Sequence, residues 1–95
     1  HHRRGGTCAI TDVVARVRRH DQRVWDREAN WHFARGAPAA FMWNFELPSG
    51  DADVEVELST SGPTGHTQSR MLGLDLRGGE LSVELGELVR ALDAP

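Results

Sequence analysis

Acidic side chains recur in the second half of the chain at spacings that would align them on one side of a sheet. They are Glu46, Asp53, Glu55, Glu57 and Asp75. Every second residue of a strand points to the same face, so Asp53, Glu55 and Glu57 would stand in a row. Such carboxylates repel one another unless they are solvated, face arginine or meet a basic partner. The pattern predicts either a solvated face or a surface that binds a basic protein, as an immunity protein masks a nuclease.

The spacing of the polar residues and glycines does not indicate a catalytic, metal-binding or phosphate-binding site. Paired carboxylates for acid–base work need a cleft, which an exposed face does not provide. His20, His32 and His66 are widely separated, and the single cysteine, Cys8, offers no metal set with them. Neither Cys8 nor Ser49 has the context of a catalytic nucleophile, and the glycine pairs lack phosphate-loop spacing. We therefore expect no catalytic residue, no metal and no cofactor.

Aromatic residues suggest a different kind of site. The chain has three tryptophans and three phenylalanines, at Trp25, Trp31, Phe33, Phe41, Trp43 and Phe45. Most such residues fill a core. A helix laid over an aromatic sheet face can also leave an apolar pocket, as in small isomerases and cyclases, with Asp26 and His32 as its polar residues. A small-ligand pocket is thus the alternative to a protein-binding face.

Length and composition limit the protein to one small domain. The sequence has 95 residues, 39% of them hydrophobic, and a net charge of −3. We expect a flexible segment over 1–10, opening on a remnant of a histidine tag, and one domain over 11–95. The single cysteine excludes an intrachain disulfide, and the lack of a long apolar run or leader predicts a cytoplasmic protein without membrane contact.

Charge divides the chain into a basic and an acidic half. Residues 1–40 contain eight arginines against four acids, and residues 41–95 contain three arginines against ten acids. The arginine-rich run from Arg16 to Arg27 could contact phosphates, but the pI of about 5.9 makes nucleic acid an unexpected partner. In a single small domain, the opposite charges favour packing of the two halves against each other.

The first part of the chain fits two secondary structures. Val13, Val17, His20, Val24 and Trp31 recur close to the helical period, with Thr11 as a possible cap, and predict a helix over 11–33 with His20 partly buried. Valines disfavour helices, however, and a turn near residues 20–22 would instead give a hairpin of strands 10–18 and 23–31.

Later segments alternate with the period of a strand. Strands are predicted over 41–47, 53–58 and 72–76, the first two paired through the short turn at 48–51, with a mobile loop over 59–67. Leucines spaced by four and three residues predict a helix over 83–93, whereas alternation from Glu80 to Leu85 also fits a strand.

Together these elements predict an α+β fold: an N-terminal helix, a three- to four-stranded antiparallel meander and a short C-terminal helix. The expected function is that of a non-enzymatic binding or accessory module, either immunity-like or a protein-interaction domain. The open edges of the meander have few protective Lys or Pro residues, so a homodimer is also expected.

Overall fold

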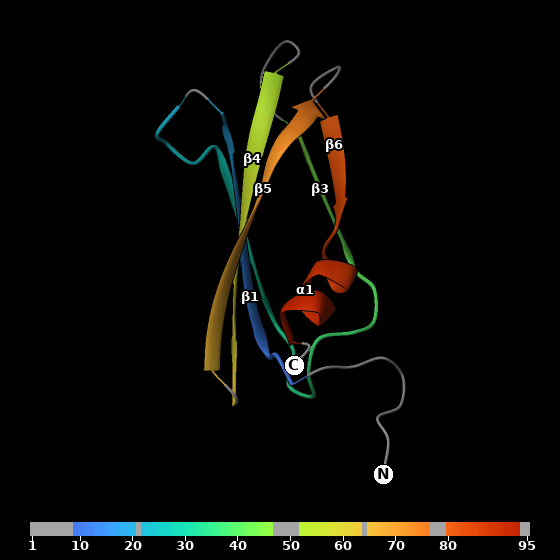
Figure 1. Cartoon of the computed structure of the whole chain (residues 1–95). Helices are drawn as coiled ribbons and strands as arrows, with labels where there is room; N and C mark the ends of the chain where they lie inside the picture. The colour runs from blue at the N-terminus through green and yellow to red at the C-terminus, as the bar shows by residue number, and fades with distance from the viewer. Residues whose placement is uncertain (1–8, 21, 47–51, 64, 77–79, 94–95) are drawn as a thin grey trace.

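The computed structural model describes residues 9–20, 22–46, 52–63, 65–76 and 80–93 (Figure 1). Within these residues the chain is built mostly of antiparallel strands and ends in one short helix. In chain order the elements are β1 (Asp12–Arg19), β2 (Arg27–His32), β3 (Met42–Glu46), β4 (Ala52–Gly62), β5 (Gly65–Leu76), β6 (Glu80–Glu84) and α1 (Leu85–Asp93).

The strands form two sheets. One sheet has four strands in the order β2-β1-β4-β5, and the other pairs β3 with β6; all pairs are antiparallel. In Figure 1 the four-stranded sheet lies opposite β3 and β6, and α1 continues from the end of β6. The molecule is elongated, with principal extents of 49 × 22 × 21 Å.

The predicted N-terminal helix is wrong, and with it the helix-first α+β fold: this region is the β1–β2 hairpin. Val13, Ala15 and Val17 are fully buried at every second position, which is the period of a strand. Val24, which completed the helical pattern, is 72% exposed, and His20 is exposed instead of partly buried. The valines thus follow their β preference because both edges of β1 find partners in β2 and β4.

The predicted meander is also wrong, because β3 and β4 belong to different sheets. β4 pairs with β1 along one edge and with β5 along the other, so it has no edge left for β3. β3 pairs instead with β6, with Trp43 opposite Val83. A short connection favours pairing of successive strands, but here the N-terminal strand β1 occupies the place that β3 was expected to take.

The segment 59–67, expected to be a mobile loop, is largely the end of a long hairpin. β4 continues to Gly62 and β5 begins at Gly65, which is its direct partner. Gly65 has a φ of 132°, a backbone conformation that glycine adopts without strain. Ser59, Thr60, Ser61 and Thr67 therefore lie in strands, where their β-branched or small side chains are well accommodated.

The C-terminal region combines the two alternatives considered for it. β6 covers the predicted strand and α1 the predicted helix, and the change occurs between Glu84 and Leu85. Gly86 is buried where the helix begins, and a Cβ there would lie 2.3 Å from the Cα of Ala40. The backbone preceding β3 can approach α1 so closely only because this residue has no side chain.

The hydrophobic core lies where the two sheets and α1 meet. Its buried members are Ile10, Val13, Ala15, Val17, Ala37, Phe45, Val54, Val56, Leu58, Val83, Leu85 and Val89. Trp31, Phe41 and Trp43 are partly buried and pack against this cluster. The aromatic residues of 41–45 and the apolar residues of 54–58 thus share one core, as expected, although their strands face each other from separate sheets. Ile10, assigned from sequence to the flexible N-terminal segment, is 5% exposed.

Candidate functional site

The two central acids of the predicted binding face are buried. Glu55 and Glu57 are 5% and 8% exposed. The register places Glu55 opposite Arg18 and Glu57 opposite Arg16 on the neighbouring strand β1. Nε and Nη2 of Arg18 lie 3.0 and 2.8 Å from Oε1 of Glu55, and Nη1 of Arg16 lies 3.7 Å from Oε1 of Glu57. These carboxylates therefore face arginines of their own chain.

Arg16 and Arg18 also have partners on the β2 side. Nε of Arg16 donates to Glu28 Oε2 at 2.6 Å, so Arg16 stands between two glutamates. The guanidinium of Arg18 lies 4.9 Å from the ring centroid of Trp25, within the range of a cation–π contact. Opposite charges thus alternate across the outer face of the sheet. This confirms that the basic and acidic halves of the chain pack together through their charges.

Of the remaining predicted acids, Asp53 and Asp75 lie on β4 and β5 of the same sheet, whereas Glu46 lies in the other sheet. Glu46 is exposed on β3, in the other sheet. Asp53 is exposed near the start of β4, and its carbonyl oxygen accepts a hydrogen bond from the backbone N–H of His20. Asp75 is opposite Asp53 in the register of β5, and its side chain lies outside the part of the chain described. The five carboxylates do not form one exposed acidic face.

Asp26 and His32, the polar residues predicted to line a pocket, also lie far from each other along β2. Asp26 precedes β2, and its carboxylate accepts a hydrogen bond from the backbone N–H of Arg19 at 3.3 Å. His32 ends β2 and is exposed, with its Nδ1 2.8 Å from Oδ1 of Asp12. Asp26 and His32 thus lie at opposite ends of one strand, and neither lines the cleft described below.

His32 and Asp12 form an exposed pair, and its geometry with Ser61 does not fit a nucleophilic triad. Hydrogen bonds from His32 and then from Thr11 hold the pKa of Asp12 below its usual value. A nucleophilic triad would need a hydroxyl on the far nitrogen of the histidine. Ser61 is the strand partner of Asp12 on its other side, so the carboxylate stands between the serine and the histidine. This order does not allow the histidine to take the proton of Ser61.

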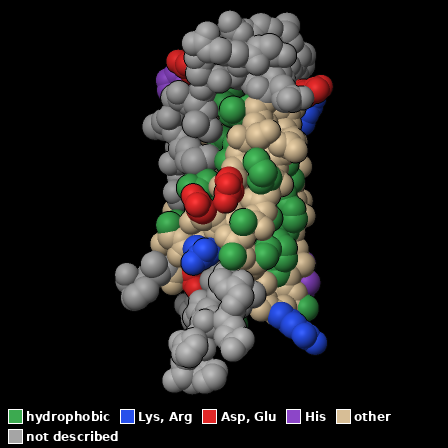
Figure 2. Space-filling model, turned by 90° about the vertical axis from the view of Figure 1, so that its right-hand side faces the viewer, with side chains coloured by type: hydrophobic (Ala, Val, Ile, Leu, Met, Phe, Trp, Pro, Cys, Tyr) green, Lys and Arg blue, Asp and Glu red, His purple; other side chains and the backbone are tan. Residues whose placement is uncertain are grey.

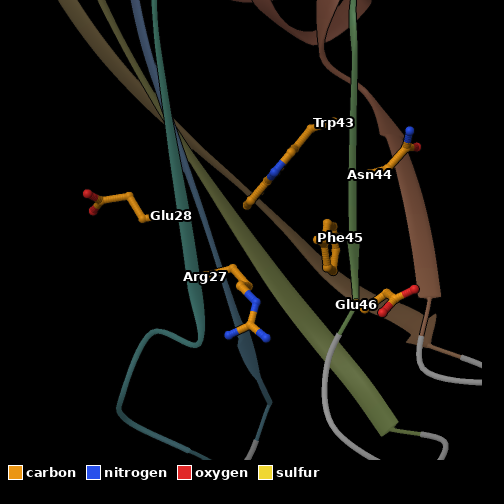
Figure 3. Close-up of a pocket in the computed structure, with 6 residues that line it drawn as sticks. All are labelled: Arg27, Glu28, Trp43, Asn44, Phe45 and Glu46. Atoms are coloured by element: carbon orange, nitrogen blue, oxygen red, sulfur yellow. The ribbon is translucent and has the colours of Figure 1, made fainter.

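A cleft of about 440 Å³ opens between β2 and β3. It is lined by Arg27, Glu28, Trp43, Asn44, Phe45 and Glu46. Figure 3 shows Trp43, Phe45 and Arg27 reaching into the space between the two strands, while Asn44 and Glu46 lie on the far side of β3. Phe45 is 5% exposed and Trp43 is partly exposed, which gives the cleft an aromatic floor.

Ring contacts hold this floor in place. Trp43 lies 4.9 Å from Phe45 and 6.1 Å from Trp31 between ring centroids, the latter edge to face. Trp31 in turn meets Phe41 at 5.6 Å. Such pairs are favourable beyond the area that they bury, so the indole of Trp43 is fixed before any ligand arrives.

Sequence reasoning identified the alternation of Trp43 and Phe45 but missed Arg27 and Asn44 as cleft residues. Arg27 was assigned to a helix, and only the hairpin alternative would have placed it on a strand beside Trp31. No sequence signal brings β2 next to β3, because that arrangement follows from the division into two sheets.

The outer surface of β3, β6 and α1 has no uniform character. In Figure 2 acidic and basic side chains stand among hydrophobic ones on this side of the molecule. Met42 is its clearest apolar feature, at 58% exposed. Its exposed acids include Glu46 and Glu84, which follow the outward alternation of their strands.

The described residues also offer neither a metal site nor a membrane-spanning helix. They contain no group of three or more His, Cys, Asp and Glu side chains placed to hold a metal ion. No described helix has the length and apolarity to cross a membrane. Comparison with known proteins returned no matching family model, no matching curated protein and no matching solved structure.

Proposed function

We propose that this domain is a non-enzymatic binding module whose contact surface is the cleft between β2 and β3. One observation carries the proposal: an ordered, partly exposed tryptophan lies on the floor of a cleft with charged residues around it. Tryptophan and arginine are the residue types that contribute most to protein-binding sites when an apolar centre is surrounded by polar groups. Trp43 and Arg27 supply that combination.

The ligand chemistry that fits best is an extended protein segment bearing an aromatic or large apolar side chain. The amide of Leu85 donates to the carbonyl of Phe41 at 2.8 Å, which sets the alternation of hydrogen bonds along β3. Backbone groups of Asn44 and Glu46 must then point away from β6, toward the edge of β3 that has no strand partner among the described residues. An extended segment can hydrogen-bond to such an edge and place alternate side chains in a pocket.

Charges favour this cleft over the outer face of the four-stranded sheet as the binding surface. Glu55 and Glu57 are buried against arginines, so their charge is largely compensated within the chain. At the cleft, Arg27 and Glu46 are exposed, and each can meet an opposite charge on a ligand. We therefore expect the bound segment to present an acid toward Arg27 and a base toward Glu46.

A small apolar molecule is the second candidate ligand, and the size of the cleft favours it. A volume of about 440 Å³ is within the range of about 300 to 1,000 Å³ typical of small-molecule sites. An aromatic acid would fit the floor of Trp43 and Phe45 and the guanidinium of Arg27. This alternative retains the small-ligand function expected from the sequence, but its polar contact is Arg27 instead of Asp26 and His32.

Selection from a random peptide library, followed by NMR footprinting, tests the proposal. Selected peptides should contain an aromatic residue next to an acid and should shift the indole signal of Trp43 and the amide signals of Asn44 and Phe45. Arg27→Ala and Glu46→Ala should each weaken binding about fivefold or more, as expected for lost charge contacts of about 1 kcal/mol. The matched control is Arg23→Ala, because Arg23 is exposed outside the cleft.

A fragment library of aromatic acids and amines provides the second arm of the test. Fragment binding without peptide binding at Trp43 would favour the small-ligand function. If neither library shifts these signals, or if the shifts occur elsewhere on the molecule, the cleft is not the binding surface.

A further inference from the structure

One edge of β2 is unpaired within the described structure. β2 ends the four-stranded sheet and pairs only with β1. The amide of Phe33 donates to the carbonyl of Thr11 at 2.7 Å, so odd-numbered residues of β2 bond to β1. Backbone groups of Glu28, Asn30 and His32 consequently face away from β1. They form an edge to which another strand can bond.

Hydrogen bonding on the other side of β1 supports the same alternation. The amide of His20 donates to the carbonyl of Asp53 at 2.9 Å, which assigns the even-numbered residues of β1 to β4. Odd-numbered residues of β1 are then left for β2. The two hydrogen bonds, Phe33 to Thr11 and His20 to Asp53, therefore agree on which backbone groups of β2 point outward.

The edge has little protection against pairing. β2 contains no proline, and its register with β1 runs without a bulge. Prolines and bulges commonly prevent such contacts, and β2 has neither, so its inward-pointing charge at Arg27 is left as protection. Glu28, Asn30 and His32 are all exposed, so their side chains would flank an added strand without first leaving a packed core.

We propose that a second copy of this chain pairs antiparallel along β2, with the twofold axis between the Asn30 residues of the two copies. In this register Glu28 stands opposite His32 of the second copy, and His32 stands opposite Glu28 of the second copy. The three directly opposed pairs can form about six backbone hydrogen bonds. The two four-stranded sheets then become one continuous sheet.

Charge complementarity selects this occupant and this register. The Nδ1 of His32 faces Asp12 at 2.8 Å, and in the protonated imidazole the second N–H, at Nε2, can donate to Glu28 of the second copy. Arg16 holds Glu28 at the sheet surface through a 2.6 Å hydrogen bond. The same operation on the free edge of β3, centred on Asn44, would oppose Met42 to Glu46 and gain no charge pair. The sequence of β2 is self-complementary, and that of β3 is not.

Pairing along β2 is independent of the ligand proposed for the cleft, apart from a shared residue. Glu28 lines the cleft and also belongs to the edge. Trp43 belongs only to the cleft, and Asn30 belongs only to the edge. Variants at Asn30 and at Trp43 therefore test the two proposals separately.

Mass measured by light scattering over a concentration series is the first test. The wild type should shift from one chain to two as concentration rises, and Asn30→Pro should remain a single chain. The N–H of Asn30 points outward, so proline there removes no bond to β1 while blocking an added strand. Far-UV circular dichroism and an unchanged NMR signal of the Trp43 indole, recorded without ligand, identify a variant that still folds.

Cysteine crosslinking tests the register even if Asn30→Pro fails to fold. In a Cys8→Ser background, Asn30→Cys should form a disulfide-linked dimer under mild oxidation, because directly opposed residues lie about 5.5 Å apart between Cα atoms. Asn44→Cys, exposed on the edge of β3, is the matched control. A wild type that stays monomeric, or crosslinking at position 30 no faster than at position 44, would overturn the proposal.

Discussion

Removing Arg18 should destabilise the protein strongly, because Glu55 would lose a buried charge partner. Glu55 is 5% exposed, and two nitrogens of Arg18 lie within 3.0 Å of its Oε1. Breaking a fully buried pair by removing one partner costs about 3 to 5 kcal/mol. The side chain of Arg18 is 22% exposed, so solvent already screens part of the interaction. We therefore expect Arg18→Met to cost about 2 to 3 kcal/mol.

Thermal unfolding followed by circular dichroism measures this loss. For a domain of this size, a loss of 2 to 3 kcal/mol lowers the Tm by about 10 to 20 °C. Arg35→Met is the control, because Arg35 is exposed in a turn and its replacement should leave the Tm nearly unchanged.

The double variant Arg18→Met with Glu55→Leu distinguishes a buried pair from a generally sensitive position. Replacing both partners by apolar side chains removes the uncompensated charge, so the double variant should be more stable than Arg18→Met alone. An Arg18→Met variant with the Tm of the wild type, or a double variant less stable than both single ones, would refute the reasoning. The former result would show that the contact of Arg18 with Glu55 contributes little to the free energy of unfolding.

Three other substitutions have definite expected outcomes. Gly86→Ala should destabilise the protein by more than about 2 kcal/mol in urea unfolding, because the added Cβ would lie 2.3 Å from Ala40 Cα. This loss is expected although alanine is the better helix former. A stabilised variant would contradict the close approach. Trp43→Ala should lower the free energy of unfolding by about 2 to 3 kcal/mol, less than the loss of a fully buried aromatic side chain. Val24→Ala should leave it unchanged, because Val24 is 72% exposed. Equal losses at both positions would count against the core described. The depressed pKa of Asp12 contributes stability that is present above the unfolded value of 3.8 and is lost as pH falls through the folded value. Below about pH 4 the Tm of the wild type should therefore fall more steeply than that of Asp12→Asn, and parallel curves would contradict the His32 contact.

Local patterns predicted β3 and parts of β4 and β5 as strands, but they favoured a helix over β1 and β2 and predicted the strand partners poorly. The alternation of Val54, Val56 and Leu58 predicted correctly that these residues lie in the hydrophobic core. This alternation could not show that β1 pairs with the edge of β4 where β3 was expected. Pairing between distant segments leaves no periodic pattern in the sequence of either segment. Val13 and Val17 satisfied both the helical and the strand period, and the tertiary partners of β1 decided between them.

The candidate site was predicted in part for the same reason. Trp43 and Phe45 were identified as one aromatic face, but the cleft also needs Arg27 from a strand that sequence reasoning treated as helix. Glu55 and Glu57 were correctly placed on one side of a strand. Their exposure was misjudged because a carboxylate with an arginine on the neighbouring strand can be buried, and the register supplying that arginine is not visible in the sequence.

The pairing of β3 with β6 has a consequence for synthesis on the ribosome. β3 leaves the ribosome well before β6, its hydrogen-bonding partner, whose last residue is Glu84. The β1–β2 hairpin can form early because its contacts are local, but the second sheet must wait until β6 has been made. During that interval the aromatic face of Trp43 and Phe45 lacks its neighbour strand and can associate with other nascent chains. We expect slowing translation after β3 to increase aggregation, whereas the same slowing after α1 should have no effect.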